Sequence, residues 1–307
     1  MMPVDPATAT AAVVFTINWM WDSYGKNAVD GLAQRLGRSR ERAQLEREWQ
    51  EATQKYLTKL YDQVNWLRLL GKREGMPLEQ IFTDLNVLDK LSAEQWYSRD
   101  ALQNDFLQRR GFHWRREEVR RDGLAVVKQF PRLYILGKPG AGKTTFLKYV
   151  TLEALKGRLG QKLPLFVSLK ELSDAGTAIL PFMAEQLRQC GFAEAEAFLR
   201  QLLAKGDAIV LFDGLDEVNL EQDRRAKQIA AMKAFVQEFD PCQVLITCRI
   251  AASDYSFERF KYVEMADFNE MQQQTFIFRW FHDDLARRDA CWVGLQAADK
   301  EGLRELA

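Results

Sequence analysis

The stretch GKPGAGKTT, residues 137–145, combines glycines, a lysine and two hydroxyls in the spacing GxxxxGK[ST]. Glycine lets the backbone turn its N–H groups toward phosphate oxygens, and a helix that begins at the loop adds a partial positive charge. Lys143 is then placed to reach β- and γ-phosphates, and Thr144 to offer a hydroxyl to Mg²⁺. The alternative is a glycine-rich turn with an incidental lysine. The predicted nucleotide-binding residues are Gly137, Gly140, Gly142, Lys143, Thr144 and Thr145.

A second stretch, DAIVLFDGLDEV, ends an apolar run in acidic residues. Asp213 stands at the C-terminal end of the predicted strand, where ligands bind in open α/β sheets, so we expect it to hold Mg²⁺ together with Thr144. Asp216 and Glu217 follow within one turn and are predicted to orient or polarise the attacking water. Gly214 allows a sharp turn between them. The alternative is an acidic cluster that solvates the strand end and caps the next helix.

Arg249 follows the apolar run VLITC and completes the predicted catalytic set with Asp216 and Glu217. A guanidinium at a strand's C-terminal end can sense a γ-phosphate by charge-assisted hydrogen bonds. The alternative is an ordinary surface arginine. The chain has no N/T-K-x-D signature of a guanine-specific site, so ATP/ADP and Mg²⁺ are the expected cofactors.

The elements that position these residues change character along the chain. From about residue 31 to residue 121 the sequence is helix-like, and apolar residues at steps of three or four predict one long helix over 41–70. After Gln129, short apolar runs alternate with patterns of helical length, which predicts a doubly wound α/β domain whose parallel sheet is covered on both faces. The expected strands are 132–136, 163–169, 208–213, 243–248 and 262–265, and the expected helices include 143–156, 181–203 and 221–239.

The composition limits where the protein works and what it binds. Its 307 residues carry 43 basic and 43 acidic side chains, so no global field attracts nucleic acid or an anionic membrane. The four cysteines form no CxxC pair, which favours free thiols in a reducing compartment. The apolar AAVVFTINWMW stretch is too short to span a bilayer. We expect a cytoplasmic protein without a membrane span.

One local exception to this balance is the stretch LQRRGFHWRREEVRR, residues 107–121, which interleaves arginines with two aromatic residues. Such a pattern can bind nucleic-acid phosphates and stack bases. The favoured alternative is a solvated helix face with its aromatic residues in the core. Nucleic acid is therefore the less favoured partner.

Taken together, GKPGAGKTT, LPLFVSLKEL, DAIVLFDGLDEV and QVLITCRIAASDYSF with the trailing YVEMADFNEMQQQTFIFRWF resemble the NACHT family of STAND-class signal-transduction ATPases. The resemblance implies a P-loop NTPase sheet in the order 5-1-4-3-2, flanked by helices and preceded by an all-α N-terminal domain. It implies that residues around 123–131 line the base. The expected domains are a helical effector or regulatory part at 1–121, the nucleotide-binding domain at 122–285, and the start of a truncated helical domain at 286–307.

The resemblance also implies a function. Family members act as NLR-like switches that exchange ADP for ATP and assemble with copies of themselves, and many bacterial relatives are linked to antiviral defence. We therefore expect a weak Mg²⁺-dependent ATPase that serves as a signalling switch, with itself and an unidentified trigger as partners. The alternatives are a phosphotransferase acting on a small molecule and a nucleic-acid-associated ATPase. The chain ends near LRELA, before the winged helix and sensor regions of family members, so we expect weaker nucleotide retention.

Overall fold

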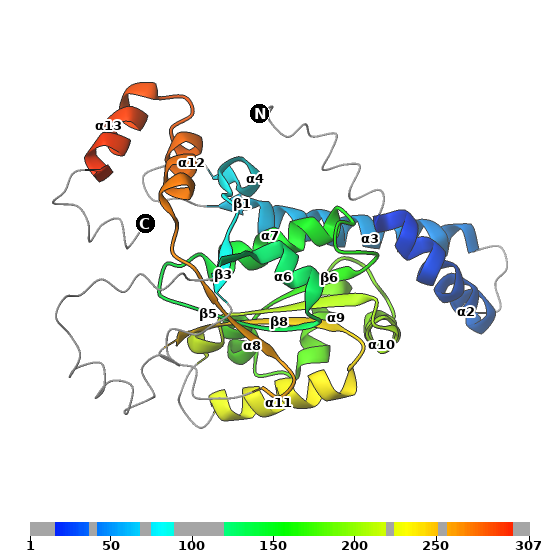
Figure 1. The fold of residues 1–307 in the computed structure, drawn as a ribbon. Coiled ribbons are helices and arrows are strands. Elements are labelled where there is room, and N and C mark those ends of the chain that lie inside the picture. The colour runs from blue at the N-terminus through cyan, green and yellow to red at the C-terminus, as the bar shows by residue number, and fades with distance from the viewer. Residues whose placement is uncertain are drawn as a thin grey trace. The chain divides into compact units, whose positions relative to one another are not determined.

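The computed structural model describes residues 16–36, 42–67, 75–88, 120–218, 224–250 and 257–296. Figure 1 shows the elements in chain order, coloured from the N-terminus to the C-terminus. The chain forms two compact units, and each unit joins two separate stretches of sequence. The first unit comprises Met1–Gln80 and Thr144–Leu245, and the second comprises Ile81–Lys143 and Ile246–Ala307. Each unit therefore depends on packing between residues that are far apart in the sequence.

Seven of the strands in the described part of the chain form a mixed sheet in the order β4-β3-β9-β5-β8-β7-β6. Its five strands β9-β5-β8-β7-β6 have the expected 5-1-4-3-2 order, which confirms the predicted P-loop NTPase fold. The strands are β3 (Asn86–Leu88), β4 (Arg120–Asp122), β5 (Arg132–Gly137), β6 (Leu163–Ser168), β7 (Ala208–Asp213), β8 (Gln243–Arg249) and β9 (Lys261–Met265).

In the first unit, β6 and β7 run parallel over their full length, with Leu163 opposite Ala208 and Ser168 opposite Asp213. Five consecutive residues of β7, Ala208 to Phe212, are fully buried, so both faces of this strand are covered. One cover is the helix α11 (Arg224–Glu238), whose Phe235 ring packs edge-on against Phe212 at 5.9 Å. The uninterrupted apolar run of β7 follows from this double burial.

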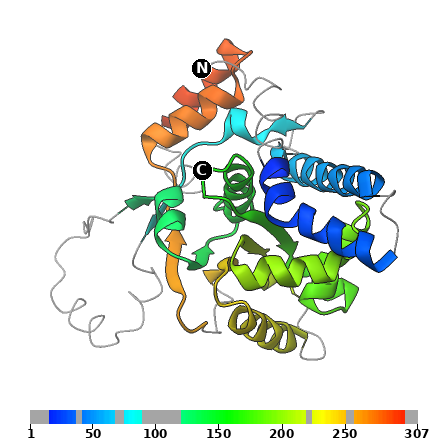
Figure 2. The ribbon, with the colours of Figure 1, turned by 90° about the vertical axis from the view of Figure 1, so that its right-hand side faces the viewer.

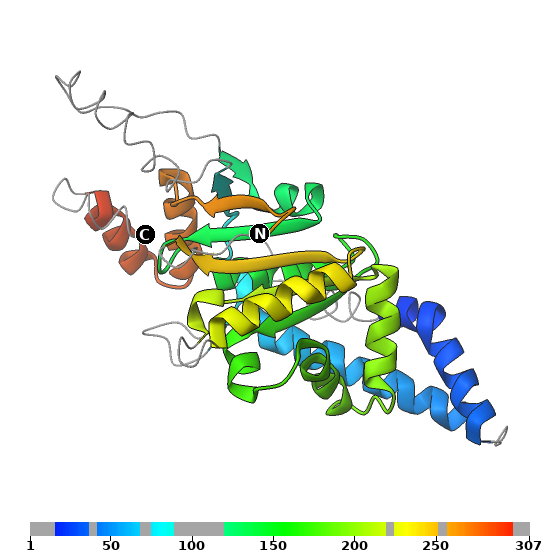
Figure 3. The same ribbon diagram turned by 90° about the horizontal axis from the view of Figure 1, so that it is seen from below.

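The other helices of the nucleotide-binding part are α7 (Lys143–Leu155), α8 (Leu169–Ala175), α9 (Ile179–Arg188) and α10 (Ala195–Lys205). The single helical pattern expected over 181–203 is wrong, because the chain forms two helices there. Between them Gly191 adopts φ 106°, a backbone conformation that interrupts a helix and that a residue with a side chain rarely takes. Figure 3 shows α9 and α10 as separate neighbouring helices.

The N-terminal region is helical, as expected, and its residues up to Gln80 belong to the first unit. It contains the π-helical turn η1 (Trp21–Gly25), α2 (Lys26–Leu36), α3 (Arg42–Asn65) and α4 (Leu78–Ile81). Figure 2 shows α2 and α3 side by side. The apolar face of α3 is buried, and its Trp49 ring lies 5.9 Å from Phe192 and 6.5 Å from Phe198. A short antiparallel ladder, β1 (Trp66–Leu67) with β2 (Met76–Pro77), follows α3.

The second unit is built around β5 and β9, which run parallel with Leu133 opposite Lys261 (Figure 3). Strand β3 pairs antiparallel with β9, and β4 pairs antiparallel with β3. Residues 86–88 therefore add a sheet strand to a region that the sequence predicted as helical, and the buried side chain of Val87 explains this position. The helices of this unit are α6 (Gly123–Gln129), α12 (Glu270–Trp280) and α13 (Leu285–Gln296).

Two sequence expectations fall partly outside the described residues. Of the basic stretch 107–121, only Arg120 and Arg121 are described, and they belong to β4. The C-terminal part at 286–307 is described as far as residue 296, as α13.

Candidate nucleotide site

The glycine-rich loop connects the end of β5 at Gly137 with the start of α7 at Lys143. Gly140 and Gly142 adopt φ values of 81° and 80°, a region that residues with a Cβ rarely occupy. The N–H of Ala141 donates to the carbonyl of Lys138 at 3.2 Å and tightens the turn. The glycines predicted from the motif thus give the loop its shape.

Lys143 is held over this loop by two backbone carbonyls. Its Nζ donates to the oxygens of Gly137 and Lys138, both at 2.9 Å. The ammonium group therefore lies within the turn and at the first residue of α7, where the helix has its partial positive charge. An ammonium with three donors beside a helix N-terminus suits the oxygens of a phosphate chain.

Two hydroxyls follow in the first turn of α7, within the first unit. Thr144 is exposed and Thr145 is half-buried. Asp213 ends β7 in the same unit and acts electrostatically on Lys148, one helical turn after Thr144. Burial lowers the pKa of Lys148, and the charge of Asp213 opposes that shift. The Thr144 hydroxyl and the Asp213 carboxylate are oxygen ligands of the kind that Mg²⁺ uses beside substrate phosphates.

The acidic residues after β7 form a tight turn. Gly214 has φ 78° and precedes the 3₁₀ turn η4 (Leu215–Glu217), in which the N–H of Glu217 donates to the Gly214 carbonyl at 3.0 Å. A Cβ on Gly214 would lie only 3.2 Å from Cδ of Glu217, so the glutamate side chain folds back over the glycine. Glu217 is exposed and Asp216 is half-buried. The turn therefore presents one carboxylate to solvent directly after the strand end.

The predicted sensor, Arg249, is the last residue of β8 and is exposed. It belongs to the second unit with the loop residues Gly137, Gly140, Gly142 and Lys143, whereas the hydroxyls and the acidic turn belong to the first. The predicted site residues thus fall into two groups, and each group lies within one unit.

The family model of the NACHT domain matches residues 132–284. Residues 132–284 are a NACHT domain. The match begins at the first residue of β5 and includes the glycine-rich loop, the acidic turn and Arg249. A NACHT domain is a nucleotide-binding NTPase domain, so the chain carries a nucleotide-binding P-loop NTPase module. No match was found among curated protein sequences.

Several solved structures are similar to this chain at low identity. AMPPCP-bound DnaA from Aquifex aeolicus is 16% identical, with 59% of this chain and 62% of that chain covered and a TM-score of 0.34. A DNA replication initiation factor is 13% identical, with 60% and 57% covered and a TM-score of 0.37. PCH-2 from C. elegans is 13% identical, with 53% and 46% covered and a TM-score of 0.34. The chain spans less than two thirds of each of these proteins.

One contact of the NACHT domain was not predicted from the sequence. Lys138, a variable position of the loop motif, forms an ion pair with Asp267 at 2.8 Å, and Arg120 donates to the Asp267 carbonyl at 2.7 Å. Lys138 and Asp267 are 129 residues apart, so no local pattern links them. Both side chains are largely exposed, and such a pair contributes at most about 1 kcal/mol. Its effect is to tie the loop to the segment between β9 and α12.

Among the residues that the structure describes, none of the helices has the length and apolar character needed to cross a bilayer. The four cysteines are free, as the sequence suggested: three are buried and Cys291 is exposed.

Proposed function

We propose that the chain is an ATP-binding, slowly hydrolysing signalling switch whose nucleotide state controls assembly with copies of itself. The NACHT domain supports nucleotide binding in general terms. Support for the phosphate-binding role comes from the left-handed glycines and from Lys143, which two loop carbonyls hold at the start of α7. In this proposal the loop N–H groups and Nζ of Lys143 bind the β- and γ-phosphates, and Thr145 helps to hold the α-phosphate side.

The metal role falls to Thr144 and Asp213. The Thr144 hydroxyl and the Asp213 carboxylate would hold Mg²⁺, which neutralises phosphate charge when it is bound. Support comes from the position of Asp213 at the end of β7 and its electrostatic effect on Lys148 of α7. Both observations belong to one unit.

The hydrolytic role rests on the acidic turn, which is the observation that carries this proposal. Glu217 folds back over Gly214 and is exposed, so it can accept a hydrogen bond from an attacking water. Asp216 would orient the turn or the water, and Arg249 would sense the γ-phosphate. A metabolic phosphotransferase has no need of a second acidic pair after the metal aspartate, and this makes the switch the better-supported reading.

The remaining parts of the chain have proposed roles that follow from the family resemblance. Residues 1–121 would be the effector or regulatory part, and this region contributes strand β3 to the sheet. Residues 123–131, which include α6, would line the adenine. An antiviral role and a cytoplasmic location are extensions of the same resemblance.

The test compares ATP binding, hydrolysis and particle mass for the wild type, Lys143→Ala and Glu217→Gln. We expect Lys143→Ala to lose tight ATP binding and nucleotide-dependent assembly. We expect Glu217→Gln to keep binding but to hydrolyse about 100-fold more slowly, because removal of a general base costs roughly that factor or more. The matched controls are Lys170→Ala and Asp174→Asn, which change exposed side chains of α8.

Three outcomes would refute the switch. The first is fast turnover that a small acceptor molecule stimulates, with no change in particle mass. The second is unchanged hydrolysis in Glu217→Gln. The third is ATPase activity that depends on added DNA or RNA, which would favour a nucleic-acid-associated enzyme instead.

A further inference from the structure

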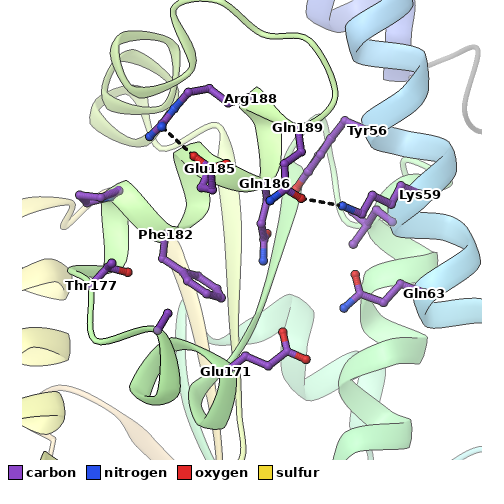
Figure 4. A pocket seen from close by; sticks show the side chains of 13 residues that line it. Tyr56, Lys59, Gln63, Glu171, Thr177, Phe182, Glu185, Gln186, Arg188 and Gln189 are labelled. Atoms are coloured by element: carbon purple, nitrogen blue, oxygen red, sulfur yellow. Dashed lines mark hydrogen bonds and ion pairs between the residues drawn. The ribbon is translucent and has the colours of Figure 1, made fainter.

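A hollow of about 600 Å³ lies within the first unit between α3, α8 and α9 (Figure 4). It is separate from the glycine-rich loop and the acidic turn, because none of their residues lines it. Its volume falls in the range of pockets that bind drug-sized molecules, roughly 300–1,000 Å³. One wall belongs to the long N-terminal helix α3, and the other belongs to helices of the NACHT domain. We call this hollow the α3–α9 groove.

The α3–α9 groove has an apolar centre and an amide rim. Leu60 is a buried residue of the lining, and Phe182 is half-buried and extends into the space between the helices (Figure 4). Three glutamine side chains, Gln63, Gln186 and Gln189, stand around it. Each amide offers both donors and an acceptor, so the rim can pair with N–H and C=O groups alike.

The charges in the groove are balanced, and two of them have no ionic partner. Arg188 and Glu185 pair with each other at 2.7 Å. Within the described part of the chain, Lys59 has no acidic partner, and its Nζ donates to the neutral Gln189 Oε1 at 3.2 Å. Glu171, on α8, likewise has no basic partner among the described residues. The groove thus presents one uncompensated ammonium and one uncompensated carboxylate.

We propose that the α3–α9 groove binds a short extended peptide segment of a partner protein, with an apolar side chain between residues of opposite charge. The amide rim matches the alternating N–H and C=O groups of a peptide, and Phe182 with Leu60 accepts the apolar side chain. Lys59 and Glu171 attract the two opposite charges. A nucleic acid or an anionic lipid would need an excess of basic residues, and this lining has none.

The groove is linked to the acidic turn through one short helix. Helix α8 carries Glu171 on the groove side and also contacts η4, which holds Asp216 and Glu217. A peptide that engages Glu171 therefore acts on the helix that packs against the proposed water-orienting residues. This consequence rests on the proposed function, whereas peptide binding itself does not.

The binding test uses four labelled pentapeptides, acetylated and amidated at their ends and titrated without nucleotide. Two carry opposite charges around a central phenylalanine, Lys-Ala-Phe-Ala-Glu and Glu-Ala-Phe-Ala-Lys. Two carry like charges, Lys-Ala-Phe-Ala-Lys and Glu-Ala-Phe-Ala-Glu. We expect at least one peptide of opposite charges to bind with a Kd below about 1 mM and about 2- to 5-fold tighter than both like-charged peptides, the factor that one exposed ion pair supplies. No saturable binding, or equal binding of all four peptides, overturns the proposal.

Variants separate a recognition role from a structural one. In Lys59→Gln, the affinity for the dilysine peptide should rise relative to the affinity for the diglutamate peptide. In Glu171→Gln, the affinity for the diglutamate peptide should rise relative to the affinity for the dilysine peptide. Phe182→Ala should weaken all four peptides about tenfold, as the loss of a central aromatic anchor does. Lys55→Ala and Asp174→Asn change exposed residues of the same helices outside the groove and should change nothing. A charge preference that these substitutions leave unaltered contradicts the assigned contacts.

The coupling is read separately, from ATP hydrolysis with and without saturating peptide. We expect a change of at least about twofold, which is a modest coupling for an effector site. Peptide binding without any change in hydrolysis overturns the coupling. Absence of hydrolysis in the wild type overturns the proposed function, and the nucleotide-free titration still decides whether the groove binds peptide.

Discussion

A buried cluster of charges fastens the N-terminal region to the C-terminal end of α7, and its removal has a calculable effect. Lys156 contacts Glu79 of α4 and lies 3.2 Å from Glu153 of α7. These three side chains are 17%, 8% and 2% exposed, so water compensates little for a lost partner. Arg158 also binds Glu153, with Nη1 at 2.9 and 3.0 Å from its two carboxylate oxygens. Among the described residues, Lys156 is the ion-pair partner of Glu79, and Glu79 also acts electrostatically on Arg158.

Lys156→Met should therefore leave the buried Glu79 without its ion-pair partner, with only the largely exposed Arg158 acting on it electrostatically. Loss of one partner from a buried pair costs about 3 to 5 kcal/mol, and the partial exposure of Lys156 places the expected loss near the lower end, at about 3 kcal/mol. The double variant Lys156→Met with Glu79→Leu removes both charges, and an apolar replacement of a buried pair is often close to neutral. We expect the double variant to lie within about 1 kcal/mol of the wild type.

The assay is urea unfolding followed by tryptophan fluorescence, with the free energy of unfolding obtained by linear extrapolation. Lys170→Met, an exposed lysine of α8, is the control and should change stability by less than about 0.5 kcal/mol. If Lys156→Met is as stable as this control, the ion cluster does not fasten the N-terminal region to α7. A double variant less stable than Lys156→Met would refute the reasoning about the uncompensated charge.

Three further outcomes follow from burial and backbone geometry. A thiol reagent should modify one cysteine in the native protein, the exposed Cys291, and reach the other three only after unfolding. Burial raises the pKa of the Cys242 thiol from 9.0 to about 11. The contribution of the buried neutral thiol to the free energy of unfolding is therefore present below pH 9 and is lost as the pH rises toward 11. In urea unfolding, Cys242→Ala should reduce this loss of stability at alkaline pH by up to about 3 kcal/mol. Gly25→Ala should lower the melting temperature, because its Cβ would lie 2.3 Å from the Trp21 ring, whereas Gly31→Ala, with open space around it, should raise it slightly.

The sequence predicted well those features that depend on local pattern. Each of the five expected strands appears within one residue of its predicted bounds, because an apolar run with no polar alternation has no other stable place than a doubly covered sheet. The loop at 137–145 was also predicted from its spacing, and Gly140 and Gly142 adopt the backbone conformation that the motif requires.

Features that depend on distant contacts were missed. Strand β3 is three residues long, and it is a strand because Val87 pairs opposite Met265 of β9. The break between α9 and α10 depends on the positive φ of Gly191. A single glycine inside an apolar helical pattern is not enough to predict such a break. The Lys138–Asp267 pair and the α3–α9 groove join residues more than a hundred positions apart.

The central claim is that Lys143 and the glycine-rich loop hold a nucleoside triphosphate. The most direct measurement is the titration of the wild type, Lys143→Ala and Lys170→Ala with a fluorescent ATP analogue in the presence of Mg²⁺. We expect saturable binding to the wild type and to Lys170→Ala. In Lys143→Ala the affinity should fall at least about tenfold, because a charge-assisted contact to phosphate is lost. Equal affinity of Lys143→Ala and the wild type would contradict the claim.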